Sequence, residues 1–382
     1  MKKVAGCLLV AGAASLLAQV ALAADSGSDF DPHAPTTTKD ADTGSFNNTA
    51  KGVPDVSSLL LYGKVETGFM YGNSDAGVKN SEMWNGTSYW GLRGTESLGG
   101  GTTAFFFLES GFKLLSGKGP SNGVQWSKGS YVGLYNPEFG RIEMGRMHKP
   151  DYWAYVDSDR NLDFSDSSLA AIKLQYDTVL GYDTYTDYFS NAIYYSSPHF
   201  HGLSADVAYG FSNVSGFQSR AGQEFGTRVR YAIGPFKFNL AFNNYGYYAN
   251  SKTSNSSSWK TELISASYKT WHDIEIGANY IHAHRTDDNW FASSWQVNVG
   301  IPLGQSDVNI GTAHVSQQGD RATQSYSLNY AYHLSLRTTL FADGIYYHNN
   351  RNGIVGVGVF ANDDVQAGYS PWAVGVGIKH KF

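Results

Sequence analysis

The sequence predicts an all-β fold, a transmembrane antiparallel β-barrel of about sixteen strands. The chain holds 43 Gly, 26 Tyr, 21 Phe and 9 Trp among its 382 residues, which is unlike the composition of an α/β enzyme. Past residue 23, no apolar run approaches the ~20 residues of a spanning helix, so a mature chain in a membrane must cross it as strands. Apolar and polar residues alternate along many segments, which gives each strand one face for lipid and one for water.

The N-terminal segment has the layout of a cleavable secretory signal. Two lysines precede an apolar run over residues 4–20, and residues 21–23 read Ala-Leu-Ala. We expect residues 1–23 to be removed, and Cys7 with them, so that the mature chain has no cysteine for disulfides or thiolate metal sites. Without the two lysines, the 28 basic residues fall to 26 against 33 acidic ones, and the net charge goes from −5 to −7. This balance argues against nucleic acid as a partner.

The mature chain divides into a tail and a barrel. Residues 24–57 are rich in Asp, Thr, Ser, Asn and Pro and poor in large apolar residues, a composition that cannot repay the entropy of ordering. We therefore expect a disordered N-terminal tail over 24–57 and the barrel over 58–382. The alternation is clearest at 273–282, 325–332 and 372–382. In the last of these, one face is predicted to carry Trp372, Val374, Val376, Ile378, His380 and Phe382.

The connections between segments alternate in length. Short turns are predicted at 98–101, 137–140, 234–235 and 302–304, and long polar loops at 113–126, 246–258 and 348–369. Short turns at one rim and long loops at the other are typical of outer-membrane barrels. The 324 residues from Leu59 to Phe382 allow about 20 for each of sixteen strands and its connection, and a tilted strand needs ~9 to 11. A soluble β-sandwich or propeller also alternates, but it would need a second sheet to cover each apolar face.

Several segments, in this order, resemble the general Gram-negative porins, the trimeric sixteen-stranded group found in Neisseria and Burkholderia relatives. The resemblance covers residues 59–382. The matching segments are YWGLRGTESLGGG at 89–101, LESGF at 108–112, YVGL at 131–134, FGRIEMGR at 139–146, NAIYYSSP at 191–198 and VGVGIKHKF at 374–382.

The resemblance implies a homotrimer in outer-membrane lipid that forms a water-filled channel for passive diffusion of ions and small hydrophilic solutes. No cofactor, bound metal or catalysed reaction is implied. It further implies that loop 148–190 folds into the lumen and narrows it. The terminal Phe382 closes an alternating strand, and we interpret it as a signal read by the barrel-assembly machinery.

Four residues on strands are the candidates for the lumen wall at the constriction. Arg146 matches the family arginine before the loop, and Arg93 should face the lumen together with Tyr89, which stands where the family usually has arginine. Glu109 is expected in the lumen as well. Strict alternation puts Arg146 on the face of the apolar residues of its strand, and a bulge near Gly145 would resolve this.

The loop opposite is acidic, with eight Asp against Lys149, Arg160 and Lys173 and a net charge of −5. Candidates to face the passage include Asp151, Asp157 and Asp159. Because a charge acts strongly in a narrow passage, we expect a mildly cation-selective pore at low salt. The alternative is that these carboxylates point out of the lumen or pair with basic residues, which would leave an anion preference. The eight lie at positions 151, 157, 159, 163, 166, 177, 183 and 187.

Other functions have weaker support in the sequence. A barrel enzyme or a surface adhesin on the same scaffold is the alternative, since a fold does not fix a function. We find no nucleophile elbow, no paired-histidine zinc helix and no phosphate-binding glycine loop. The pairs His199/His201 and His282/His284 each place two imidazoles on one side of a strand or turn, but no third metal ligand is evident near either in the sequence.

Overall fold

The computed structural model describes the barrel region and leaves the predicted signal and tail outside the described residues. The described ranges are 58–75, 78–119, 123–159, 169–175, 178–179, 187–212, 222–248, 256–286, 290–357 and 365–382.

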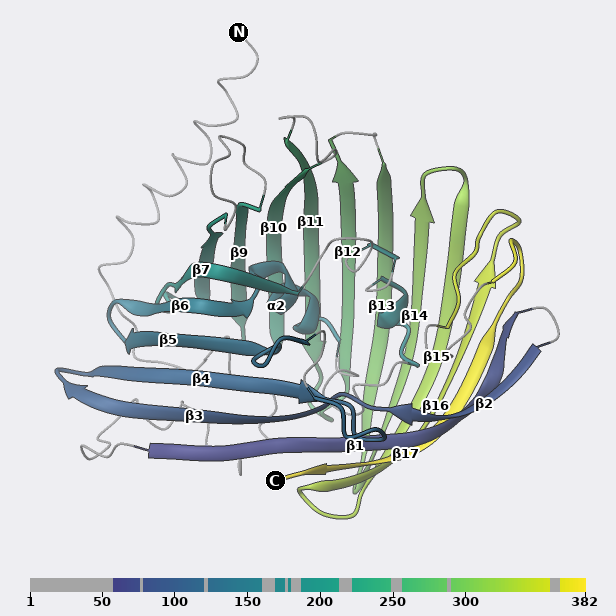
Figure 1. Ribbon diagram of the computed structural model, residues 1–382, viewed down its shortest axis with the longest axis horizontal. Helices are drawn as coiled ribbons and strands as arrows, with labels where there is room; N and C mark the ends of the chain where they lie inside the picture. The colour runs from purple at the N-terminus through teal and green to yellow at the C-terminus, as the bar shows by residue number, and fades with distance from the viewer. Residues whose placement is uncertain are drawn as a thin grey trace, which may run out of the picture.

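One closed antiparallel sheet makes up the wall (Figure 1). Strands adjacent in the chain pair with each other, and β17 pairs with β1 to complete the ring. Closure leaves no unpaired sheet edge for lipid to meet. The strands are β1 (Ser58–Asp75), β2 (Val78–Asn85), β3 (Ser88–Gly99), β4 (Thr102–Phe112), β5 (Gly129–Asn136), β6 (Gly140–His148), β7 (Tyr188–Ser196), β8 (Leu203–Gly210), β9 (Glu224–Ile233), β10 (Phe236–Tyr248), β11 (Ser256–Lys269), β12 (Glu275–Arg285), β13 (Phe291–Leu303), β14 (Ser306–Gln317), β15 (Arg321–His333), β16 (Thr338–Asn349) and β17 (Trp372–Lys381).

Two of the seventeen strands together occupy a single strand position in the barrel wall, which we call a stave. β2 pairs with the second half of β1 and β3 pairs with its first half, and only Gly86 and Thr87 separate β2 from β3. A side chain at Gly86 would collide with Glu66 of β1, its Cβ lying 2.5 Å from the Glu66 Cγ, so glycine suits this close approach. The wall therefore has sixteen staves, and the predicted fold class is confirmed.

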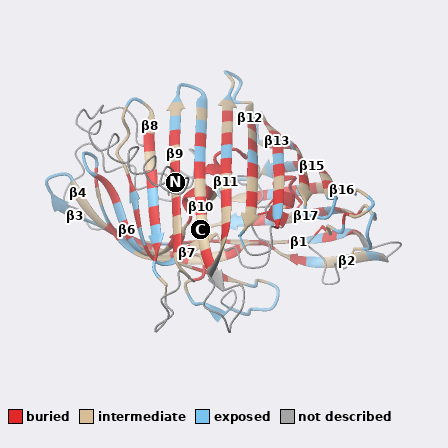
Figure 2. Cartoon of the chain, turned by 90° about the horizontal axis from the view of Figure 1, so that it is seen from above, coloured by how far each residue is buried: buried red, intermediate tan, exposed pale blue. Residues whose placement is uncertain are grey.

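The predicted alternation is confirmed along the strands (Figure 2). On β15, Tyr326 and Leu328 are exposed on the outside, whereas Ser327 between them is buried inside, as are Ser325 and Asn329 on either side. The outside is apolar because it faces lipid, and the inside is polar because it lines the lumen.

The predicted short turns and long loops fall at or between the ends of the observed strands, with one correction. Gly99, Gly100 and Gly101 all have positive φ, as a tight turn without side chains allows. The loop predicted at 246–258 is shorter, since β10 runs to Tyr248 and β11 begins at Ser256. Strands that extend above the lipid need no apolar face there, so their polar ends resemble loop sequence.

The segment after β6 enters the ring, as predicted for the constriction loop (Figure 1). Helix α2 (Pro150–Val156) packs on β9, β10 and β11, and helix α4 (Ile172–Gln175) packs on β13 and β14. None of the helices in the described ranges is long and apolar enough to cross a bilayer.

The main apolar core of the barrel lies where this loop meets the wall. Leu169, Ile172 and Leu174 of the loop are almost fully buried among wall side chains such as Ile281 and Phe341. Burial of each such loop side chain contributes ~1.5 to 3 kcal/mol, so the loop is packed in place rather than suspended in the lumen.

Candidate pore constriction

Backbone and small side chains fix the loop to the inner face of the wall. Ser265 on β11 donates a hydrogen bond to the Ala154 carbonyl oxygen (2.6 Å), and Asn298 on β13 donates to the Ser158 carbonyl oxygen (2.6 Å). At Gly277 on β12 an added Cβ would lie 1.9 Å from that same Ser158 oxygen. The loop thus approaches so closely that only glycine fits beneath it.

Asp157, a predicted lumen residue, joins a buried ion cluster behind the loop. Its Oδ2 lies 3.1 Å from Arg230 Nε and 3.6 Å from Arg228 Nη1, both on β9. Arg228 also bonds Asp206 of β8, at 2.6 Å. All four side chains are almost fully buried. Two carboxylates therefore balance two guanidinium groups, and Asp157 attaches the loop to the wall.

The other two predicted loop carboxylates also turn toward the wall that carries the loop. Asp151 accepts a hydrogen bond from Thr261 of β11 (2.9 Å), and Asp159 accepts one from Gln296 of β13 (2.6 Å). Both residues are almost fully buried. Asp151, Asp157 and Asp159, the candidates named to face the passage, are thus directed away from the open side of the loop. Positions 163, 166, 177 and 183 lie outside the described residues.

The wall opposite the loop carries the predicted residues Arg93 and Glu109, brought together by Tyr62. The Tyr62 hydroxyl donates to Glu109 Oε2 (2.9 Å), and the Arg93 guanidinium lies over the Tyr62 ring, 5.1 Å from its centroid. The register places β1, β3 and β4 side by side here.

Tyr89 lies next to this group, between two lysines. Lys64 Nζ is 5.6 Å and Lys128 Nζ is 5.3 Å from the centroid of its ring. Cations are attracted to the face of an aromatic ring. The position where the family usually has arginine is therefore flanked by two positive charges. We call Lys64, Arg93, Glu109 and Lys128, with Tyr62 and Tyr89, the wall cluster.

Further ion pairs line the inner face. Lys64 pairs with Glu66 (2.9 Å), Lys149 lies 3.4 Å from Glu224, and Arg141 pairs with Glu143. Each pair is neutral in itself, so it adds little net field to the lumen.

The prediction that a bulge turns Arg146 into the lumen is wrong. The register does shift between Gly145 and Met147, but there two residues of β7 stand against one of β6, and Asn191 of β7 has a φ of 53°. Met147 is buried on the inner face with Glu143. The extra residue thus belongs to β7, and Arg146 stays on the opposite side of β6.

Arg146 is held at the loop end of the barrel. Its Nε donates to the Ser127 carbonyl oxygen (3.1 Å), its Nη1 donates to Ser190 Oγ (2.5 Å), and its guanidinium lies over the Tyr188 ring at 4.6 Å. β4 and β5 separate its stave from that of Arg93. The structure therefore does not join these two arginines into one cluster.

Phe382 helps to close the barrel by pairing with the first strand. Its backbone N–H donates to the Gly63 carbonyl oxygen and its carbonyl accepts from the Gly63 N–H, both at 3.0 Å. Its ring covers Gly63, where an added Cβ would lie 2.5 Å from the Phe382 Cζ. The terminal residue thus takes part in the pairing of the last stave with the first.

Sequence reasoning missed the basic residues of both walls. Arg228 and Arg230 are two residues apart on β9 and alternate with the outward-facing Val229 and Tyr231. A charged residue on a barrel strand belongs on the lumen side, so this spacing could have identified them.

Comparison with known proteins agrees with the predicted family. A family model described as Gram-negative porin matches residues 8–352. An outer membrane porin of Bordetella pertussis is 26% identical, over 85% of this chain and 94% of that protein. Outer membrane porin protein 32 of Delftia acidovorans is 29% identical over the same shares. Among solved structures, an anion-selective porin from Comamonas acidovorans has a TM-score of 0.72 at 25% identity, covering 86% of this chain and 100% of that one.

Proposed function

This chain belongs to the Gram-negative porin family, and on that premise we propose that its constriction gives an outer-membrane channel a weak preference for anions. As an outer-membrane porin, the protein forms a water-filled channel for passive diffusion. The proposal concerns which solutes pass most easily. It rests chiefly on the placement of Asp151, Asp157 and Asp159 against the wall behind the loop.

The two sides of the constriction differ in the charges that they turn toward the passage. On the loop side, the Asp157 carboxylate is balanced by Arg228 and Arg230. On the opposite side, Lys64 is paired with Glu66, and the rest of the wall cluster holds two basic groups, Arg93 and Lys128, against the single carboxylate of Glu109. A charge in a narrow, partly desolvated passage acts through an effective dielectric well below that of water. The positive side should therefore dominate the field that a permeating ion meets.

The sequence alone favoured a mild cation preference, because it counted the loop carboxylates without their directions. Three of those carboxylates, Asp151, Asp157 and Asp159, bond to the wall and so do not support that expectation. The structural relative from Comamonas acidovorans, described as anion-selective, agrees with the proposal in the sign of the preference.

Reversal potentials across a planar bilayer in a tenfold KCl gradient test the proposal. We expect wild type to prefer chloride at low salt, and the preference to fade as the screening length falls from ~10 Å at 0.1 M to ~3 Å at 1 M. Lys128→Gln should move the reversal potential toward that of potassium. Lys260→Gln on β11, whose side chain lies on the outer side between the inward-facing Trp259 and Thr261, is the control and should leave it unchanged. A wild-type pore that prefers potassium would refute the proposal.

The protein is further proposed to act as a homotrimer without enzymatic activity, and Phe382 to serve the barrel-assembly machinery. The pairing of Phe382 with Gly63 supports a role in closing the barrel. Stepwise conductance in multiples of three, together with the mass of the detergent-solubilised protein, tests the trimer. A monomeric barrel with hydrolase activity or with cell-binding activity but no conductance would favour the alternative enzyme or adhesin.

A further inference from the structure

A cluster of two histidines and one glutamate lies outside the lumen, on the face of the barrel that the channel does not use. His282 and His284 are two residues apart on β12, and Glu262 on β11 lies directly opposite His282 in the register. One ring nitrogen of each histidine and one carboxylate oxygen all lie within 4.8 Å of one another. The sequence offered no third ligand for this histidine pair, and the folded barrel supplies one from the neighbouring strand.

The cluster lies on the outer surface, near the loop end of the barrel. Along β12, Ile281 and Ala283 are buried on the inner face, so the two histidines between and beyond them face outward. β12 ends at Arg285, one residue after His284. The long connections are at this end, which in outer-membrane barrels faces the cell exterior.

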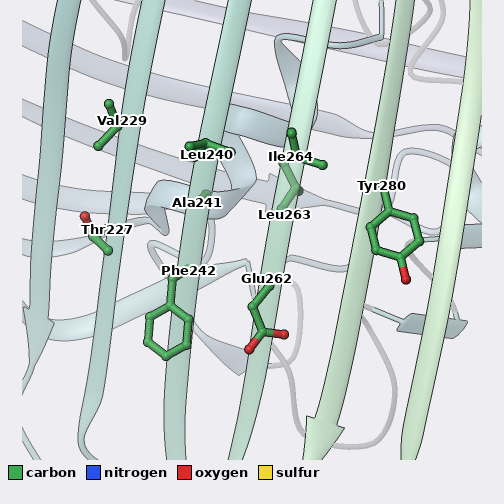
Figure 3. Close-up of a pocket in the computed structure, with 9 residues that line it drawn as sticks. All are labelled: Thr227, Val229, Leu240, Ala241, Phe242, Glu262, Leu263, Ile264 and Tyr280. Carbon is green, nitrogen blue, oxygen red and sulfur yellow. The ribbon is translucent and has the colours of Figure 1, made fainter. Parts of the chain in front are cut away.

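Glu262 is an unusual residue for this surface. It is the only charged side chain of the nine that line a hollow of about 360 Å³ over β9 to β12. Figure 3 shows its carboxylate beside Phe242 in that hollow, with Ile264 farther along the same strand and Tyr280 on the next strand. A charge on the lipid-facing side of a barrel is costly, increasingly so with depth, so a carboxylate here needs a compensating positive partner.

Two polar atoms of the cluster are inaccessible and lack a hydrogen bond, although the Glu262 and His284 side chains as a whole are 46% and 32% exposed. Glu262 Oε2 and His284 Nδ1 are both inaccessible and have no hydrogen-bond partner, and 3.8 Å separates them, too far for a hydrogen bond. His282 Nδ1 instead bonds Ser293 Oγ on β13 at 2.8 Å. That bond orients the His282 ring and leaves its Nε2 as the nitrogen for a ligand, which is the arrangement typical of metal-binding histidines.

We propose that Glu262, His282 and His284 bind a divalent transition-metal ion on the outer face of the barrel. Two imidazoles and a carboxylate suit Zn²⁺, Ni²⁺ and Cu²⁺, whereas Ca²⁺ and Mg²⁺ prefer oxygen ligands alone. The ion would balance the Glu262 charge and satisfy both unpartnered atoms. Three protein ligands leave coordination positions open to water or to an oxygen ligand from outside the protein.

Metal binding by the purified barrel tests the proposal directly. Tag-free protein in detergent is dialysed against Zn²⁺, and the bound metal is counted for each chain. Wild type should bind one Zn²⁺ at this site, and the double variant His282→Ala/His284→Ala should lose it. The matched control is His199→Ala/His201→Ala, which removes the other histidine pair at the same spacing and should keep the bound ion. Far-UV circular dichroism confirms that each variant keeps its β-sheet.

Two single variants and a spectrum make the test sharper. Glu262→Gln keeps the shape but removes the charge, and Ser293→Ala removes only the bond that orients His282. Each should weaken Zn²⁺ binding by at least ~10- to 100-fold, the usual cost of losing even an outer partner of a metal ligand. With Cu²⁺, electron paramagnetic resonance should show hyperfine coupling to two nitrogens, reduced to one in His284→Ala. Binding that survives His282→Ala/His284→Ala, or that disappears equally in the control pair, would overturn the proposal.

Discussion

Replacing Asp157 by asparagine should loosen the constriction loop without changing its fold. In the structure, Asp157 Oδ2 lies 3.1 Å from Arg230 and 3.6 Å from Arg228. At an effective dielectric of about 20, each attraction amounts to about 5 kcal/mol before desolvation is subtracted. Breaking one side of a buried ion pair costs about 3 to 5 kcal/mol net. Because asparagine can still accept one hydrogen bond, we expect the free energy of unfolding to fall by about 3 kcal/mol.

The functional consequence separates a loop anchor from an ordinary buried ion pair. Asp206→Asn is the matched control, since Asp206 pairs with the same Arg228 at 2.6 Å but belongs to the wall strand β8. Both variants should lose stability in guanidinium titrations of the barrel folded into lipid vesicles. Only Asp157→Asn releases the loop, so only this variant should raise the open-channel current noise in planar bilayers.

Two results would refute this reasoning. Equal noise in the Asp157→Asn and Asp206→Asn channels would mean that Asp157 does not hold the loop. A loss of less than ~0.5 kcal/mol in Asp157→Asn would mean that lumen water screens the cluster as it screens a surface pair. The double variant Asp157→Asn/Arg230→Gln completes a cycle, and a coupling energy of about 1.5 kcal/mol or more is expected for a close charge pair.

Three further predictions address the wall, the passage and the barrel closure. Gly277→Ala should displace the loop and change single-channel conductance, because its Cβ would lie 1.9 Å from the Ser158 oxygen; Gly344→Ala, with no atom nearer than 3.7 Å, should not. Tyr89→Arg adds a third cation between two lysines, so the reversal potential should move further toward chloride, and an unmoved potential would place Tyr89 outside the passage. Deletion of Phe382 should lower the amount of heat-modifiable barrel in the outer membrane while synthesis and secretion continue; unchanged levels would make its pairing with β1 dispensable.

The wall could be predicted from sequence because its rule is local. Every second residue of a strand faces lipid, so the side of Tyr326 or Val374 follows from its neighbours alone. The interruption of the second stave at Gly86 could not be predicted in this way. It depends on Glu66 of the neighbouring strand, which lies twenty positions away in the chain.

The constriction could be predicted only in part, because it depends on how a long loop packs. Sequence placed Arg93 and Glu109 on the inner face, and the structure joins them through Tyr62, which sequence reasoning did not single out. For Arg146, the glycine before it suggested a bulge, but the extra residue lies in β7. Which of two paired strands takes the extra residue is decided by both strands together.

The acidic loop shows why a charge count does not determine a pore's selectivity. A carboxylate that faces the passage attracts cations. When the carboxylate instead points to the wall, as Asp157 does toward Arg228 and Arg230, its charge is neutralised and the ion pair stabilises the structure. The second arrangement explains how the Asp157 carboxylate of this loop can be buried inside the barrel. Buried charges need partners, and here wall arginines provide them for Asp157. If the wall cluster around Arg93 sets the field in the passage, as proposed, substitutions there should change selectivity, and substitutions behind the loop should change stability and noise.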